Sequence, residues 1–181
     1  MKFNKFLIAA AISTTVVSSV SAFAADDTIS PTVGEIQFKG ELVNSACGLA
    51  ASSSPLLIDF GQITTSSLKN SKHAGNVRKD IELQGCDTTV AKSVKVTYNP
   101  NTVDVKDPTL AAFTSGTATG AGIGLTDSGN QPVKWGVAST SVNLVDGAVK
   151  IPFVAYVKAN GDTDVTPGTF QSSVNFKIDY Q

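Results

Sequence analysis

Apolar and polar residues alternate most regularly near the carboxyl end of the chain. The alternate apolar positions, interrupted only at residue 172, are Phe170, Val174, Phe176, Ile178 and Tyr180. Polar residues fill the positions between them. This two-residue period predicts a β-strand with one apolar face and one solvated face. Because such a strand at a terminus forms the edge of a sheet, we expect another strand to cover it.

Shorter apolar or alternating runs, separated by turn residues, predict further strands of a sandwich. They lie at residues 42–47, 56–60, 77–86, 94–98 and 150–157. The run at 150–157 is apolar at nearly every position, which predicts a strand buried on both faces, with Pro152 near its start or at a bulge. Residues 102–122 are weakly patterned, and we assign them no strand.

A turn at residues 127–130 predicts a β-hairpin. Ile123 and Leu125 alternate before this turn, and Val133 and Trp135 alternate after it. The chain is also rich in Thr, Val, Ser and Gly, and no long stretch shows a helical period of 3.6 residues. These features together predict an all-β protein.

The amino-terminal segment 1–24 has the three parts of a signal peptide. Lys2 and Lys5 form a positive start, residues 6–12 are apolar, and the segment ends in Ala-Phe-Ala, which matches the cleavage pattern. The apolar run is too short for a membrane span, although an uncleaved anchor is the alternative. We therefore predict an exported protein of one domain.

The chain has two cysteines, Cys47 and Cys86. In an exported protein we expect one disulfide between them, closing a loop of about 40 residues and contributing roughly 4 kcal/mol in the chain-entropy model. The alternatives are free thiols or a metal site. A zinc site would lack ligands, because His73 is the single histidine.

Charge and motifs favour neither nucleic-acid binding nor catalysis. The formal net charge is −1 at pH 7, and Lys and Arg are dispersed. The chain lacks the G-x-S-x-G, H-E-x-x-H and P-loop motifs, and we expect His73 to be a solvated loop residue. The loop aspartates, which lack calcium-loop spacing, are Asp104, Asp107, Asp162 and Asp164. We predict no enzyme activity, no cofactor and no metal.

The segment before residue 42 also alternates. Gly34, Ile36, Phe38 and Gly40 form one row, with polar residues between them. Three interpretations stand: a tail, a first strand of the same domain, or a strand meant for the sheet edge of another molecule. In the third interpretation, Gly34 permits a close approach of the two backbones.

Four motifs lie along the chain after residue 24. Residues 38–47 read Phe-Lys-Gly-Glu-Leu-Val-Asn-Ser-Ala-Cys, and residues 83–86 read Leu-Gln-Gly-Cys. Residues 151–153 read Ile-Pro-Phe, and residues 176–181 read Phe-Lys-Ile-Asp-Tyr-Gln. These motifs resemble those of chaperone–usher pilins, and within that family the type 1 fimbrial major subunits. The resemblance covers most of the chain after residue 24, and residues 102–122 carry little of it.

The resemblance implies an incomplete, six-stranded immunoglobulin-like β-sandwich with a groove beside its last strand. Residues 25–39 would be a donor-strand extension and residues 40–181 the pilin domain. The donor residues would be Thr32, Gly34, Ile36 and Phe38. The acceptor strand, which a periplasmic chaperone would bind first, would comprise Val174, Phe176, Ile178, Tyr180 and Gln181.

The predicted function is that of a structural subunit of a surface fimbria, which polymerises by donor-strand exchange and supports cell adhesion. Its expected partners are other copies of itself, a periplasmic chaperone, an outer-membrane usher and minor fimbrial subunits. The alternatives are a minor fimbrial adaptor subunit or a non-enzymatic exported immunoglobulin-like binding module.

Overall fold

The computed structural model describes residues 32–161 and 164–181. The chain divides into two units, Met1–Gly40 and Glu41–Gln181. In the first unit, residues 32–40 form neither helix nor strand, and their side chains are exposed. The predicted signal peptide, residues 1–24, lies outside the described residues. No helix in the described part of the chain is long and apolar enough to cross a membrane.

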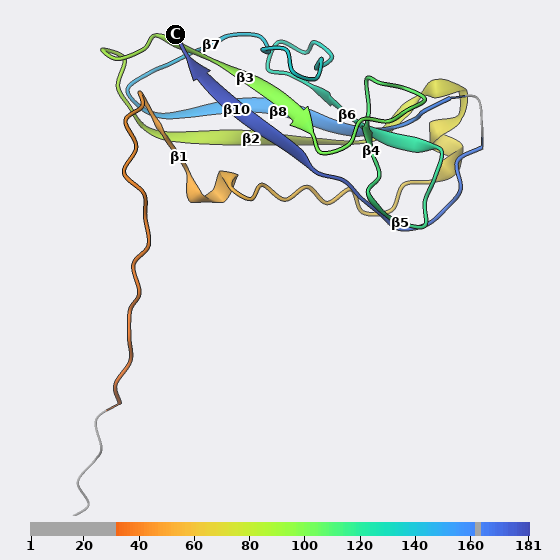
Figure 1. Cartoon of the computed structure of the whole chain (residues 1–181), viewed down its shortest axis with the longest axis horizontal. Helices are drawn as coiled ribbons and strands as arrows, with labels where there is room; N and C mark the ends of the chain where they lie inside the picture. Colours follow the sequence, from red (N-terminus) through yellow and green to blue (C-terminus); the bar gives the residue numbers. More distant parts are fainter. Residues whose placement is uncertain (1–31, 162–163) are drawn as a thin grey trace, which may run out of the picture. The chain divides into compact units, whose positions relative to one another are not determined.

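In its described residues, 41–161 and 164–181, the second unit has β-strands, two short 3-10 helices and their connecting loops (Figure 1). The strands are β1 (Gly48–Leu49), β2 (His73–Cys86), β3 (Ser93–Pro100), β4 (Ala111–Ala112), β5 (Ser115–Gly116), β6 (Ala121–Thr126), β7 (Val142–Asn143), β8 (Gly147–Ala159), β9 (Phe170–Gln171) and β10 (Val174–Tyr180). The 3-10 helices are η1 (Ala51–Ser53) and η2 (Thr65–Ser71). The all-β prediction is confirmed, and β4 and β5 lie in the region that the pattern left unassigned.

The strands of the described residues form three antiparallel sheets. The largest has five strands in the order β1-β2-β8-β6-β4, the second has the order β10-β3-β7, and β5 pairs with β9. In Figure 1, β10 runs diagonally across the β2–β8 pair, as expected for two packed layers of twisted strands. The apolar residues between the layers form one continuous core.

The alternation within β8 shows which face packs on the core. Its inward residues, each at most 6% exposed, are Val149, Ile151, Phe153, Ala155 and Val157. The residues between them are half-buried or exposed. The prediction of burial on both faces is therefore wrong, because this sheet packs against another sheet on one face only.

Pro152 also differs from its prediction. It lies within β8 opposite Asp80, and the β2–β8 register is regular from Val77 to Leu83. The proline therefore marks neither a strand start nor a bulge. It is tolerated because β6 pairs with β8 only between Val154 and Ala159. Pro152 lies before this stretch, so no strand on the β6 side needs a hydrogen bond from its backbone nitrogen.

Two of the predicted strands are not formed. Residues 42–47 run without a ladder and then bend, and only β1 after them pairs with β2. Residues 56–60 are extended but have no ladder partner. Both segments have strand-like composition, and what they lack is a neighbouring strand in register. In contrast, the predicted strands at 77–86, 94–98 and 150–157 are confirmed as parts of β2, β3 and β8.

The predicted hairpin is half correct. The turn forms, with the Asp127 carboxylate accepting the N–H groups of Gly129 and Gln131, each at 2.9 Å. The return arm makes a single bridge, at Pro132, and no strand. The Val133 N–H group donates to the Leu125 carbonyl oxygen at 2.9 Å beside this bridge, and no strand pairing follows it in the described residues.

Two local predictions concern the cysteines and the histidine. Cys47 and Cys86 form the predicted disulfide. His73 is exposed as expected, but it begins β2 rather than lying in a loop, and its ring lies 4.7 Å from the Tyr156 ring. The polar composition of residues 69–80 hid this strand start, because the outer face of a one-sided sheet is also polar.

Candidate strand-acceptor groove

The last strand, β10, has a partner on one side only. It pairs with β3 along its whole length, from Val174 opposite Pro100 to Tyr180 opposite Val94. On its other side, no described strand pairs with it. The predicted edge is thus present. Its backbone N–H and C=O groups on that side are open to a further strand.

The facing wall is the unpaired segment 56–60. Leu56, Ile58 and Phe60 are half-buried and pack against the core, whereas Leu57 is 80% exposed. The segment therefore alternates as a strand does, without the hydrogen bonds of a strand. The sequence pattern predicted a strand at residues 56–60 but no role for them in a site.

Between these two walls lies a groove of about 890 Å³. Its floor comprises core residues of four strands, Ile81, Tyr98, Ile123, Leu125, Phe153 and Ala155. Each of these is at most 7% exposed. The groove therefore reaches the core of the domain, and its shape and apolar lining suit an extended segment with alternating apolar side chains.

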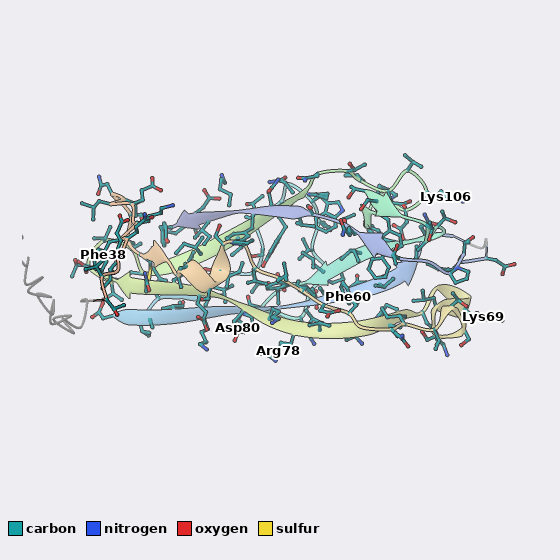
Figure 2. The ribbon with its side chains drawn as sticks, turned by 90° about the horizontal axis from the view of Figure 1, so that it is seen from below. Phe38, Phe60, Lys69, Arg78, Asp80 and Lys106 are labelled. Atoms are coloured by element: carbon teal, nitrogen blue, oxygen red, sulfur yellow. A yellow bond between two sulfur atoms is a disulfide. The ribbon has the colours of Figure 1, made fainter. Side chains whose placement is uncertain are left out.

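Aromatic rings meet at the groove. The Phe60 ring lies 6.0 Å from the Phe170 ring, and Phe113 stacks on Phe170 at 4.4 Å. Figure 2 shows Phe60 on the extended segment. Phe60 and Phe170 both line the groove, so their contact links the segment 56–60 to β9, which precedes β10. Neither Phe60 nor Phe113 was assigned a role from the sequence, because nothing in the local pattern shows that distant segments meet.

The end of β10 is tied to the disulfide. The Tyr180 hydroxyl donates a hydrogen bond to the Cys47 carbonyl oxygen at 3.2 Å. Burial raises the pKa of the Tyr180 phenol, so the hydroxyl stays protonated and able to donate. Beyond it, the Gln181 carbonyl oxygen accepts the N–H groups of Lys92 and Ser93 at 2.7 and 2.9 Å. The C-terminal residue therefore continues the β3–β10 pairing.

The five predicted acceptor residues all lie on or next to β10. The four apolar ones are partly buried and pack against the core, whereas the Gln181 side chain is exposed. Of the five, Val174 and Phe176 line the groove itself. Their role as the acceptor strand remains a prediction.

The predicted donor residues lie in the first unit. Thr32 and Gly34 are exposed, and Ile36 and Phe38 are 78% and 90% exposed. Gly34 has no heavy atom within 4 Å of the position that a Cβ would take. The role of this segment as a donor strand remains a prediction.

Within residues 32–161 and 164–181, no three His, Cys, Asp or Glu side chains are placed to hold a metal ion. Two of the loop aspartates, Asp104 and Asp107, have partners within the domain, and Asp162 lies outside the described residues. Asp104 accepts hydrogen bonds from the N–H groups of Lys106 and Asp107, and Asp107 forms an ion pair with Lys158 at 2.9 Å.

Comparisons with known proteins agree with this architecture. A family model described as "Fimbrial protein" matches residues 36–181. The chain is 55% identical, over the full length of both proteins, to a major fimbrial subunit of Proteus mirabilis. It is 35% identical to a type 1 fimbrial protein A chain of Escherichia coli, with 98% of each chain covered.

Solved structures give the same result. One is a chaperone–usher pilus whose structure was used to explain rod uncoiling. It matches this chain with a TM-score of 0.73 and 28% identity, covering 85% of this chain and 99% of that one. The rod subunit of the P pilus matches with a TM-score of 0.62 and 27% identity, covering 76% and 100%. The fold is therefore the incomplete immunoglobulin-like fold of pilins. The chain belongs to the fimbrial protein family and is a structural subunit of a surface pilus.

Proposed function

We propose that this subunit polymerises by donor-strand exchange, in which the extended segment around residues 32–38 of one copy fills the groove of another. The observation that carries the proposal is the groove itself, which reaches the core. It lies between the unpaired edge of β10 and the segment 56–60, which has no ladder partner. An inserted strand can form main-chain hydrogen bonds with these edges, while its alternate side chains fill the groove.

The donor segment has side chains that such a groove would take. Ile36 and Phe38 are exposed in this structure and lie two residues apart, so they fall on the same face of an extended strand. Burying these two apolar side chains at about 1.5–3 kcal/mol each gives about 3–6 kcal/mol. Withdrawing the strand would break its ladder bonds and return its apolar side chains and the groove walls to water, so dissociation is slow.

The assembly is head to tail. The donor segment and the groove are different surfaces of one chain, so the contact between copies is heterologous and propagates into an open helical filament. The same open edge accounts for the assembly partners: a periplasmic chaperone covers β10 before polymerisation, and an outer-membrane usher replaces it with the next subunit. The finished filament supports cell adhesion.

The proposed role is structural and includes no catalytic step or cofactor. The family relationship supports this, since the matched relatives are described as fimbrial and pilus subunits. In the structure, the hydrogen bonds of Asp104, Asp107 and Asp127 close turns and loops, which accounts for these carboxylates without a reaction.

Denaturing electrophoresis of isolated surface fimbriae tests the proposal. A polymer joined by donor strands enters the gel as a high-mass ladder without boiling and as a monomer after boiling. Subunits lacking residues 25–37 should fold with the chaperone but fail to join a filament as donors. Normal polymerisation of this truncated subunit would overturn the donor role, and a monomer in both lanes would favour an exported binding module.

A further inference from the structure

One end of the domain holds an exposed valine on a well-ordered loop. Val105 is 96% exposed, yet hydrogen bonds close the loop around it. The Asp104 carboxylate accepts the backbone N–H groups of Lys106 at 2.8 Å and Asp107 at 3.0 Å. It also accepts the side-chain amide of Asn160 at 2.7 Å. The loop therefore keeps an apolar side chain in water at a fixed position, ready for a contact without further ordering.

Two further exposed valines lie on two adjoining turns. Val90 and Val145 are 65% and 58% exposed. The turns are joined by a hydrogen bond of 2.8 Å from the Thr88 N–H group to the Asp146 carboxylate. Single exposed valines are common on protein surfaces. Here two of them share one small surface, which we call the Val90–Val145 turns.

These two surfaces lie at opposite ends of β8. The Val90–Val145 turns precede Gly147, where β8 begins. The Val105 loop is held at the other end of the strand by the ion pair of Asp107 with Lys158. A strand of 13 residues spans roughly 40 Å. The surfaces therefore cannot meet within one domain.

The two ends differ in charge. Figure 2 shows Lys69 and Lys106 at the same end of the domain, where Asp104 and Asp107 also lie and Lys158 pairs with Asp107. Among these five residues, three bases stand against two acids. At the other end, the carboxylates of Asp87 and Asp146 interact electrostatically with each other and with Lys92. Two acids and one base leave that surface negative. Opposite charges of this kind favour the approach of unlike ends and fix their orientation more than they add affinity.

We propose that the Val105 loop of one copy packs on the Val90–Val145 turns of the neighbouring copy in the filament. The proposal rests on the head-to-tail polymer proposed above, because such a polymer brings unlike ends of successive subunits together. The donor strand alone joins two subunits through one extended segment, which allows them to rotate. The second contact restrains this rotation and so sets the angle between successive subunits.

Cross-linking of assembled fimbriae tests this contact. Fimbriae built from Val105→Cys/Val145→Cys subunits are treated with a short bismaleimide and then boiled in detergent with a reductant. We expect a covalent ladder of dimers and higher multimers. Neither single variant should give a ladder, because the contact joins unlike surfaces. A matched control is Val105→Cys/Val137→Cys, since Val137 is 55% exposed but lies beside the middle of β3.

The absence of a ladder from the double variant, or an equal ladder from the control, would overturn the proposal. A second variant covers the case in which the double-cysteine subunit fails to assemble. Val105→Asp places an acid opposite Asp87 and Asp146, so its fimbriae should lose the regular helical repeat in micrographs, while Val137→Asp fimbriae should keep it. Unchanged Val105→Asp rods would contradict the contact. Failure of the donor-strand proposal is distinguishable, because wild-type fimbriae would then fall apart without boiling.

Discussion

Replacing Ile36 by Ala in the proposed donor segment gives the most direct measure of what the groove contributes. The side chain is 78% exposed in the free subunit, so its truncation should leave the stability of the subunit itself unchanged. Any loss of filament stability then comes from the neighbouring subunit's groove. Val33 provides a matched control, because it is 86% exposed but lies three residues away, on the opposite face of an extended strand.

The magnitude follows from the lining of the groove. Its floor residues are at most 7% exposed, so an inserted isoleucine would meet packed core atoms, and Ala would leave a cavity. Such a truncation costs about 2–5 kcal/mol when the site is fully buried. At 1.4 kcal/mol for each factor of ten, affinity for the groove should fall by about 30-fold to several thousand-fold. Val33→Ala should cost less than about 0.5 kcal/mol.

The assay uses a synthetic peptide of residues 27–40 and a subunit lacking residues 25–37, prepared with its chaperone. Peptide insertion is followed by the rise in melting temperature and by the rate of peptide exchange. At roughly 2–4 °C for each kcal/mol, Ile36→Ala should lower the melting temperature of the complex by at least about 4 °C. Equal losses of melting temperature for the Ile36 and Val33 variants would refute the prediction that these two side chains lie on opposite faces of the inserted strand. No loss for Ile36→Ala would refute burial in the groove.

Three further predictions concern the domain and its edge. Cys→Ser at Cys47 or Cys86 should destabilise the subunit by roughly 4 kcal/mol and lower its yield, as measured by chemical unfolding; thiol labelling of unreduced, denatured wild-type protein would contradict the disulfide. Tyr180→Phe should cost about 1 kcal/mol through its lost hydrogen bond and leave chaperone capture intact, whereas Tyr180→Ser should also reduce capture in pull-down assays. Burial acts to raise the pKa of the Asp127 carboxyl, but backbone N–H groups outweigh it and hold the pKa below its usual range. Because the unfolded state then binds the proton more tightly, the stability that the ionised Asp127 carboxylate contributes is complete at neutral pH and is lost as the pH falls below about 4. In unfolding curves measured across pH, Asp127→Asn should make this acid-dependent loss of stability smaller.

The periodic parts of the fold could be predicted from the sequence. The alternation in β10 reports a face that packs on the core, and the apolar run at residues 150–157 also forms a strand, β8, where the pattern places it. The burial on both faces that this run predicted is absent, because only one face of its sheet packs on the core. The segment 56–60 has the same alternation but no ladder. A local pattern records which side chains are buried, and it does not record whether a neighbouring strand exists to pair with. This is why the sequence predicted a strand where the structure has a wall of the groove.

The site required distant segments to meet, and this limited what the sequence could predict. The terminal edge and its apolar row were predictable from residues 170–181 alone. The contact of Phe60 with Phe170 joins residues more than a hundred positions apart, and no spacing in the chain indicates it. Pro152 was misplaced for a related reason, since its tolerance depends on where β6 ends and not on β8 itself.

The distribution of burial in the groove indicates where an inserted strand would add stability. Floor residues such as Leu125 and Phe153 are only 5% and 6% exposed before any strand is present, so covering them removes little apolar surface from water. The walls are different, because Leu56, Val174 and Phe176 remain partly exposed beside unpaired backbone groups. A donor strand therefore gains most from the walls, through ladder bonds and apolar contacts on both sides at once. Such a domain is folded before assembly, and its unpaired edges make it prone to incorrect association until a strand fills the groove.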